Sequence, residues 1–360
     1  MIKRDHGGNV GEISRIHGID EDKIIDFSAN INPLGYPPGL RDAVIKEFDS
    51  VLNYPDIDSF DLISGLSKYH GIDRDSILAG NGSTEFIYWI PMVFKPKKAV
   101  IVTPAFSEYE KGLRMAGTKV SYFQAGNKTD FSVDIDSLCK CLREGFDVIY
   151  FCNPANPTGT LTPKNDLCGV VACADEIGAL AVIDEAFMDF VEEESVKEEI
   201  FRFPNLIVLR SMTKFFGIPG LRMGYVMASA PCIKKIREYK PPWTVNSLAQ
   251  KAAVSALADG DYIRETRQYI SSERKFLKNA LNEIPGLSAF ESAANFFLVF
   301  MGGGVGLNST GLRDRLAKEG ILIRDCGNFH GLGDRYFRVA VKRHEQNMLL
   351  IEKLKAVIRL

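Results

Sequence analysis

The chain has 360 residues, 46% of them hydrophobic and 25% charged, a composition ordinary for a soluble protein with one large and one small domain. Its formal net charge of −2 gives no reason to expect nucleic acid or an anionic membrane as a partner. No apolar stretch approaches the roughly 20 residues that cross a bilayer, and the amino terminus lacks a signal-peptide core, so we expect a cytoplasmic protein. The cysteines show no CxxC spacing, which indicates neither a disulfide framework nor a zinc site.

Strands alternate with helical stretches from about residue 40 to residue 235, which predicts an α/β fold with a doubly wound, mostly parallel sheet. Four of the predicted strands deliver polar groups at their carboxyl ends, and these strands are 99–102, 148–152, 180–183 and 206–209. Ligand sites in open α/β sheets lie at that edge. We therefore expect the functional site there.

Residues 78–85 (LAGNGSTE) run from an apolar stretch through a glycine turn into a helical pattern. Such a turn points backbone N–H groups and the positive end of the helix dipole at one spot, which suits a phosphate. A capped helix after a tight turn needs no ligand, so this motif alone leaves both interpretations open.

Residues 147–159 (DVIYFCNPANPTG) predict a buried strand that ends in a turn rich in Pro and Asn. Turn formation explains most of these residues without any function. Asn156 is the exception, because an amide at that point can donate a hydrogen bond to a phenolate oxygen.

Residues 179–187 (ALAVIDEAF) place Asp184 at the end of a nearly all-apolar strand. A carboxylate there costs several kcal/mol unless a cation pairs with it. A protonated pyridine nitrogen is a suitable cation.

Residues 209–225 (LRSMTKFFGIPGLRMGY) place Lys214 three positions after Ser211 and eight before Arg222. Most lysines are simply solvated. A lysine after an apolar strand, with a hydroxyl and a guanidinium at these offsets, has the parts of a Schiff-base site with an anion clamp. That layout suits pyridoxal 5'-phosphate.

The carboxy-terminal part of the chain predicts a smaller α+β domain. Pro241-Pro242 breaks the chain, helical segments follow over 246–282, and NFFLVFM, GILIRDC and YFRVAV are typical strands. We expect residues 1–25 to pack with this small domain (241–360), and residues 26–240 to form the large domain. The glycine cluster 302–306 lacks the spacing of a dinucleotide site and is predicted to be a loop.

Together, NPTG, the Asp-Glu-Ala strand end and Ser-x-x-Lys followed by Arg resemble the fold-type I pyridoxal-phosphate enzymes of the aspartate aminotransferase superfamily. The resemblance implies that Lys214 forms the Schiff base, that Asp184 pairs with the pyridine nitrogen and that Asn156 donates to the 3'-oxygen. The residues that it assigns to the cofactor phosphate are Ser83, Thr84, Ser211 and Arg222, and Gly82 is a further cofactor-binding residue.

The same resemblance implies that Phe106, in TPAFSEY, stacks on the cofactor ring. It also implies that Tyr54, in NYPD, reaches the phosphate of the neighbouring subunit, which predicts a homodimer. Phe187 is a departure, because many relatives carry a tyrosine there that hydrogen-bonds the 3'-oxygen. Asn156 is then the main donor to that oxygen, and the acidity of the Schiff base is open.

The motifs HGGN, DFSANINPLG, NYPD, TKFFGIPGLRMGY and ILIRDC are together similar to the L-threonine-O-3-phosphate decarboxylases of cobalamin synthesis. By this likeness His6, Asn30, Arg324 and Arg338 hold the substrate phosphate, since guanidiniums bind phosphate oxygens bidentately. The substrate carboxylate has no arginine and leaves as CO2. The product is then (R)-1-amino-2-propanol O-2-phosphate.

Two other functions compete with the decarboxylase. Histidinol-phosphate aminotransferases share the cofactor residues but usually carry Ser-Lys-x-Phe-Gly-Leu-Ala-Gly-Leu-Arg around the lysine and lack the HGGN start. A non-catalytic regulator with this fold needs a fused DNA-binding segment, for which 25 residues leave no room. For the two arginines, a surface salt bridge is the alternative to a role in binding.

Overall fold

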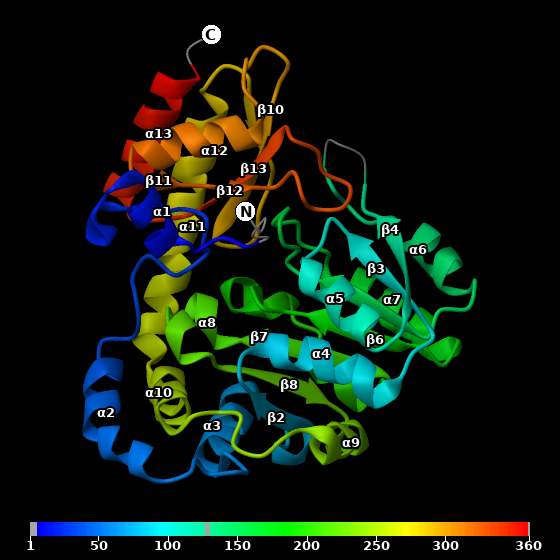
Figure 1. Ribbon diagram of the computed structural model, residues 1–360. Coiled ribbons are helices and arrows are strands. Elements are labelled where there is room, and N and C mark those ends of the chain that lie inside the picture. The colour runs from blue at the N-terminus through cyan, green and yellow to red at the C-terminus, as the bar shows by residue number, and fades with distance from the viewer. Residues whose placement is uncertain (1–5, 127–129, 359–360) are drawn as a thin grey trace.

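The computed structural model describes residues 6–126 and 130–358. Figure 1 shows two parts, a large one with a broad sheet between helices and a smaller one above it that carries the carboxy-terminal strands. The large sheet has seven strands in the order β2-β8-β7-β6-β5-β3-β4. Their bounds are β2 Ile77–Gly80, β3 Lys98–Thr103, β4 Lys119–Gln124, β5 Val148–Cys152, β6 Leu180–Asp184, β7 Leu206–Ser211 and β8 Gly224–Ala228.

The large sheet is mostly parallel, as predicted. β3, β4, β5, β6 and β7 pair in parallel, whereas β8 is antiparallel to both of its neighbours. β5 illustrates why these sequences form central strands, since its β-branched and aromatic residues are buried on both faces. The α/β fold class is confirmed.

Helices cover both faces of this sheet, so it is doubly wound (Figure 1). α4, α5 and α9 pack on one face in a core with Tyr150 and Val182, while α3 and α7 pack on the other in a core with Ile149 and Ile183. The helices of this part are α2 Leu40–Lys46, α3 Phe60–His70, α4 Ser83–Phe94, α5 Ser107–Met115, α6 Ile135–Leu142, α7 Lys164–Glu176, α8 Met212–Phe215 and α9 Ala230–Tyr239.

The smaller part is built on an antiparallel sheet in the order β12-β13-β10-β9. Its strands are β9 Leu287–Ala289, β10 Phe296–Met301, β12 Arg324–Asp325 and β13 Tyr336–Ala340, and its helices are α12 Ser309–Lys318 and α13 His344–Val357. The glycine cluster after β10 lies in turns and loop, as predicted. Within the described residues, no helix is both long and apolar enough to span a membrane.

The amino-terminal segment lies against the smaller part. β1 (Ile25–Asp26) pairs in parallel with β11 (Ile321–Leu322), and α1 (Val10–His17) contacts α12. α10 (Ser247–Ala258) packs on α2 and α3 of the large part, and the long α11 (Gly260–Asn282) follows it. We propose that the two sheets are the cores of two domains and that α11 joins them.

Candidate active site

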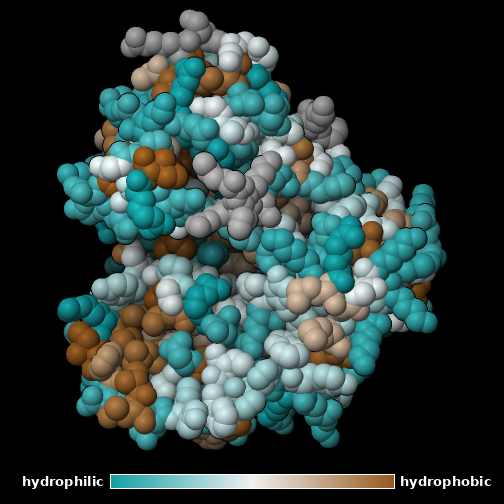
Figure 2. Space-filling model, in the orientation of Figure 1, coloured by the Kyte–Doolittle hydropathy of each residue, from teal (hydrophilic) through white to brown (hydrophobic). Residues whose placement is uncertain are grey.

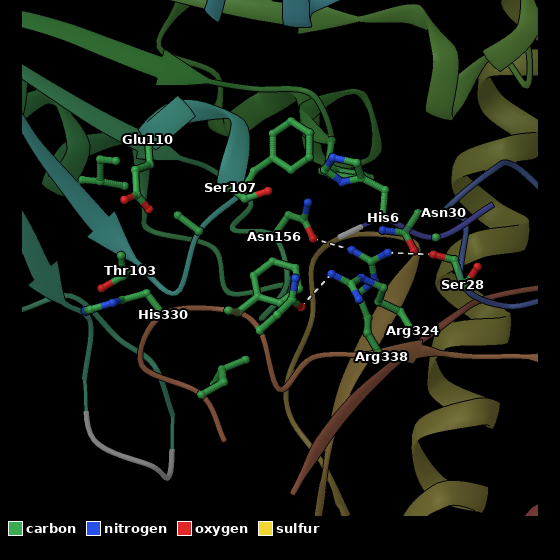
Figure 3. Close-up of a pocket in the computed structure, with 18 of the residues that line it drawn as sticks. His6, Ser28, Asn30, Thr103, Ser107, Glu110, Asn156, Arg324, His330 and Arg338 are labelled. Carbon is green, nitrogen blue, oxygen red and sulfur yellow. Dashed lines mark hydrogen bonds between the residues drawn. The ribbon is translucent and has the colours of Figure 1, made fainter. Parts of the chain in front are cut away.

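The carboxyl ends of β3, β5, β6 and β7 open into a cavity of about 640 Å³, which adjoins a smaller one of about 100 Å³. Figure 3 shows that the larger cavity is also lined by residues from the smaller sheet and the amino-terminal segment. The two cavities bring together most of the predicted site residues, namely His6, Asn30, Ser83, Thr84, Phe106, Asn156, Asp184, Ser211, Lys214, Arg222, Arg324 and Arg338.

Lys214 lies on the single helical turn α8, directly after β7. Ser211 caps this turn, because its Oγ accepts a hydrogen bond from the Thr213 N–H at 3.4 Å. Burial lowers the pKa of Lys214 to about 8, and the positive charges of Arg222 and Arg338 act in the same direction while Asp184 opposes them. A lysine with a lowered pKa has more of the neutral amine that attacks an aldehyde.

Asp184 ends β6 and is only 4% exposed. Its Oδ2 accepts a hydrogen bond from the Tyr109 hydroxyl at 2.6 Å, and its Oδ1 accepts one from the Ala186 N–H at 3.0 Å. Burial raises the pKa of Asp184, although these hydrogen bonds oppose the shift. The positive charge of Lys214 also opposes the shift, but no salt bridge is formed by Asp184 among the described residues, so a protonated ring nitrogen fits as its close partner.

Glu185 is the neighbouring carboxylate, and its environment is different. Its Oε2 lies 3.1 Å from Nη1 of the fully buried Arg210 and accepts a hydrogen bond from the Ser195 hydroxyl at 2.6 Å. A buried carboxylate with its own guanidinium needs no further cation. Of the Asp-Glu pair, Asp184 is therefore the residue that has room for a cationic ligand.

The turn before α4 is shaped to receive a phosphate. Gly82 has φ of +77°, and a Cβ on it would lie 2.7 Å from Nη2 of Arg222. A Cβ on Gly224 would lie 2.2 Å from the backbone nitrogen of Ser83. The Ser211 and Thr213 hydroxyls lie 2.8 Å apart and line the smaller cavity together with Ser83 and Arg222. A helix amino terminus, hydroxyls and a guanidinium form a donor set that fits the phosphate of the cofactor.

Asn156 lines the cavity after β5, and its Oδ1 accepts a hydrogen bond from Nη1 of Arg338. This contact, drawn in Figure 3, leaves the Nδ2 group of Asn156 as the donor toward the cavity. Phe187 lines the same wall and packs against Phe296 with ring centroids 5.0 Å apart. Phe106, at the start of α5, forms part of the wall as well.

Arg324 and Arg338 lie directly opposite each other on the antiparallel strands β12 and β13. Both are buried, and burial lowers the pKa of Arg338 to about 10, with Arg324 adding to the shift and Cys326 opposing it. Nη2 of Arg338 donates to the Ser28 carbonyl at 2.8 Å, and Nη2 of Arg324 donates to Asn328 Oδ1 at 2.8 Å. Like charges directly opposite on neighbouring strands destabilise a sheet, so this arrangement favours a bound anion between them.

Two predicted cofactor residues do not line either cavity. Gly82 lies one residue before Ser83, and a side chain at this position would meet the Arg222 guanidinium. Tyr54 is 80% exposed and stacks on Trp243, with ring centroids 4.7 Å apart. The single chain therefore does not bring Tyr54 to its own site.

Several residues around the cavities were not singled out from the sequence. Tyr109 follows Phe106 in the same motif, but only the fold shows that its hydroxyl reaches Asp184. His330 stacks on Tyr122 at the cavity wall, with ring centroids 3.9 Å apart. Further polar or aromatic residues of this kind include Ser28, Thr103, Ser107, Glu110, Thr213, Asn328 and Phe329.

The model of the family described as aminotransferase class I and II matches residues 22–354. The chain belongs to this family. The family resemblance predicted from the motifs is confirmed, and pyridoxal 5'-phosphate is the cofactor.

Individual relatives of this family match nearly the whole chain. The chain is 35% identical to the threonine-phosphate decarboxylase of Salmonella typhimurium, over 99% of this chain and 98% of that protein. It is 32% identical to the adenosylcobalamin biosynthesis bifunctional protein CobDQ of Leptospira interrogans, over 97% of this chain and 40% of that protein. The solved histidinol-phosphate aminotransferase of Clostridium acetobutylicum is 32% identical, with a TM-score of 0.85 over 92% of this chain and 98% of that one.

Proposed function

We propose that this protein decarboxylates L-threonine O-3-phosphate to (R)-1-amino-2-propanol O-2-phosphate as a step of cobalamin synthesis. The main support is the pair Arg324 and Arg338, which lie opposite each other on β12 and β13 and line, with Asn30 and His6, the cavity that Lys214 also lines. Guanidiniums bind phosphate oxygens bidentately, and the amide and imidazole add further contacts. The relatives from Salmonella and Leptospira support the same choice.

The residues of this chain divide the work between cofactor and substrate. Lys214 holds the cofactor covalently, and we assign its phosphate to Ser83, Thr84, Ser211 and Arg222. When bound, pyridoxal phosphate supplies an electron sink for the bond that breaks at the substrate α-carbon.

Asp184 keeps the proton on the cofactor's ring nitrogen, and Nδ2 of Asn156 donates to its 3'-oxygen. Arg324 and Arg338 fix the substrate phosphate and thereby leave the carboxylate without a guanidinium partner. Lys214 Nζ is then placed to deliver a proton to the α-carbon after CO2 has left.

The reaction itself gives the direct test. Purified holoenzyme with L-threonine O-3-phosphate is expected to release CO2 and the phosphorylated amino alcohol in equal amounts. Absence of CO2 would reject the proposal.

The competing function is a histidinol-phosphate aminotransferase, which the solved relative from Clostridium favours. Stable conversion of the bound cofactor to pyridoxamine phosphate by glutamate would support that function instead.

Arg324→Ala and Arg338→Ala are expected to raise KM for threonine phosphate much more than they lower kcat. A contact that is equal in ground and transition states contributes to KM. Losing one charged partner in a shielded site costs roughly 2 to 5 kcal/mol. Steady-state kinetics with threonine phosphate and with threonine measures the preference for the phosphate, which should shrink sharply in both variants. Arg264→Ala, on the exposed face of α11, is the matched control. If both variants keep the wild-type preference, the phosphate binds elsewhere.

We further propose that the protein is a cytoplasmic homodimer. Seven free cysteines suit a reducing compartment. The segment around Tyr54 exposes Ile45, Phe48 and Leu52, and Figure 2 shows an apolar surface over the α2 side of the molecule. Exposed apolar patches of this kind mark interfaces.

Tyr54→Phe is expected to weaken cofactor retention, since Tyr54 reaches the phosphate in the neighbouring subunit. Mixed dimers of Tyr54→Phe and Lys214→Ala subunits measure this directly. Each such dimer has one site with both native residues and one site with neither. Partial recovery of activity on mixing is the expected result. If the active sites prove to be built from one chain alone, the dimer arrangement is wrong.

A further inference from the structure

Glu108, in the first turn of α5, is a buried carboxylate that gathers donors from separate segments of the chain. It is 8% exposed. Its Oε1 lies 2.9 Å from Nε2 of His6 and accepts a hydrogen bond from Nζ of Lys111 at 2.8 Å. Its Oε2 accepts a hydrogen bond from the Tyr88 hydroxyl of α4. A carboxylate with such partners is held in one orientation.

The contact between Glu108 and His6 joins α5 of the large part to the amino-terminal segment. α5 packs on the large sheet, whereas the segment that contains His6 is tied to Ser28, whose Oγ accepts a hydrogen bond from the Gly8 N–H at 2.9 Å. A Cβ on Gly7 would lie 2.5 Å from the Ser28 carbonyl oxygen, so this segment passes close to the backbone there. Figure 3 shows His6 at the same end of the cavity as Asn30 and the two arginines.

Packing alone leaves the His6 ring considerable freedom. The His6 side chain is 48% exposed, and its ring lies 5.5 Å from that of Phe106. Within the described residues, Glu108 is the hydrogen-bond partner of the ring, and it occupies Nε2. Nδ1 is then the ring nitrogen left for a phosphate oxygen, to which it donates when the imidazole carries both ring protons. Fixing a ring in advance lowers the entropy lost when a ligand binds.

We infer that Glu108 is a positioning residue that orients His6 toward the phosphate of the substrate. This inference rests on the proposed function. It adds a residue to the four that were predicted to hold the substrate phosphate, which are His6, Asn30, Arg324 and Arg338. Burial raises the pKa of Glu108, but the hydrogen bonds from Lys111 and Tyr88 outweigh it and the net shift is downward. Glu108 is therefore an anion at neutral pH and a strong acceptor for the imidazole N–H.

Glu108→Gln keeps the shape of the side chain and removes its charge. Steady-state kinetics of the holoenzyme should show a KM for L-threonine O-3-phosphate about tenfold higher, on the scale of one hydrogen bond to a charged group. The KM for L-threonine, which lacks the phosphate, should not change, and kcat should stay within about threefold because the contact is uniform. Glu265→Gln, exposed on α11, is the control for loss of one carboxylate.

The double variant separates a positioning role from a structural one. If Glu108 acts through His6, then Glu108→Gln should weaken threonine phosphate binding no further in a His6→Ala background. Additive effects, or equal weakening for threonine and threonine phosphate, would overturn the inference. Hydrogen exchange without substrate gives an independent readout, since the Gly8 amide should exchange faster in Glu108→Gln and at the wild-type rate in Glu265→Gln. Unchanged exchange would overturn the inference too.

Failure of the proposed function gives a different pattern. If the wild-type holoenzyme binds no threonine phosphate, the proposed function and the role of Glu108 both fall. If the wild type binds it and Glu108→Gln binds it equally well, only the role of Glu108 falls.

Discussion

Lys214→Ala is expected to abolish decarboxylation while the protein stays folded. Lys214 lines both cavities, and Asp184 and Asn156 line the smaller one with it. Burial and the positive charges of Arg222 and Arg338 disfavour the ammonium form of Lys214 and lower its pKa to about 8. In the proposed function, replacing it removes both the covalent attachment of the cofactor and the amine that returns a proton to the α-carbon.

The measurement combines three signals from the same sample. The absorbance of the imine should disappear, CO2 release should fall to background, and the far-UV circular dichroism should match that of the wild type. Lys275→Ala, on the exposed surface of α11, should leave all three unchanged. Retained decarboxylation in Lys214→Ala would remove Lys214 from its assigned role.

Local sequence patterns predicted the large sheet well because its strands carry their own signal. Residues 148–152 form β5 as predicted. β3 is one residue longer than its predicted segment at each end, and β6 and β7 are one and two residues longer at the carboxyl end. Consecutive apolar, β-branched residues between turn signals specify a buried parallel strand. Since parallel strands share one carboxyl edge, the meeting of Asn156, Asp184 and Lys214 followed from chain order alone.

Contacts between distant segments could not be predicted in the same way. Tyr109 and Asp184 are 75 residues apart, and His6 and Glu108 are 102 apart. No local pattern marks such pairs, because they arise from how α5 and the amino-terminal segment pack. The pairing of Arg324 with Arg338 depends on the register of β12 and β13, which local periodicity does not fix.

Asp184→Ala is expected to lower kcat by at least about 100-fold, the scale of losing one electrostatic contact to the transition state. The residues to which we assign the cofactor phosphate are unchanged in this variant, so the cofactor should still bind. Steady-state kinetics of the holoenzyme measures the effect, with Asp175→Ala on the exposed side of α7 as the control. A kcat within a factor of three of wild type would contradict the role of Asp184.

The same carboxylate gives a second test that needs no turnover. Burial raises the pKa of Asp184 in the folded chain, so without a cationic partner its ionisation at neutral pH opposes folding. Asp184→Asn should therefore raise the melting temperature of the cofactor-free protein at neutral pH. The gain should shrink as the pH falls and the wild-type carboxyl becomes protonated. In the holoenzyme, where we assign the cofactor's ring nitrogen as the partner of Asp184, the substitution should no longer stabilise. A cofactor-free Asp184→Asn variant that melts below the wild type at neutral pH would show that Asp184 is already satisfied by Tyr109 and Ala186, and that it has no need of a cation.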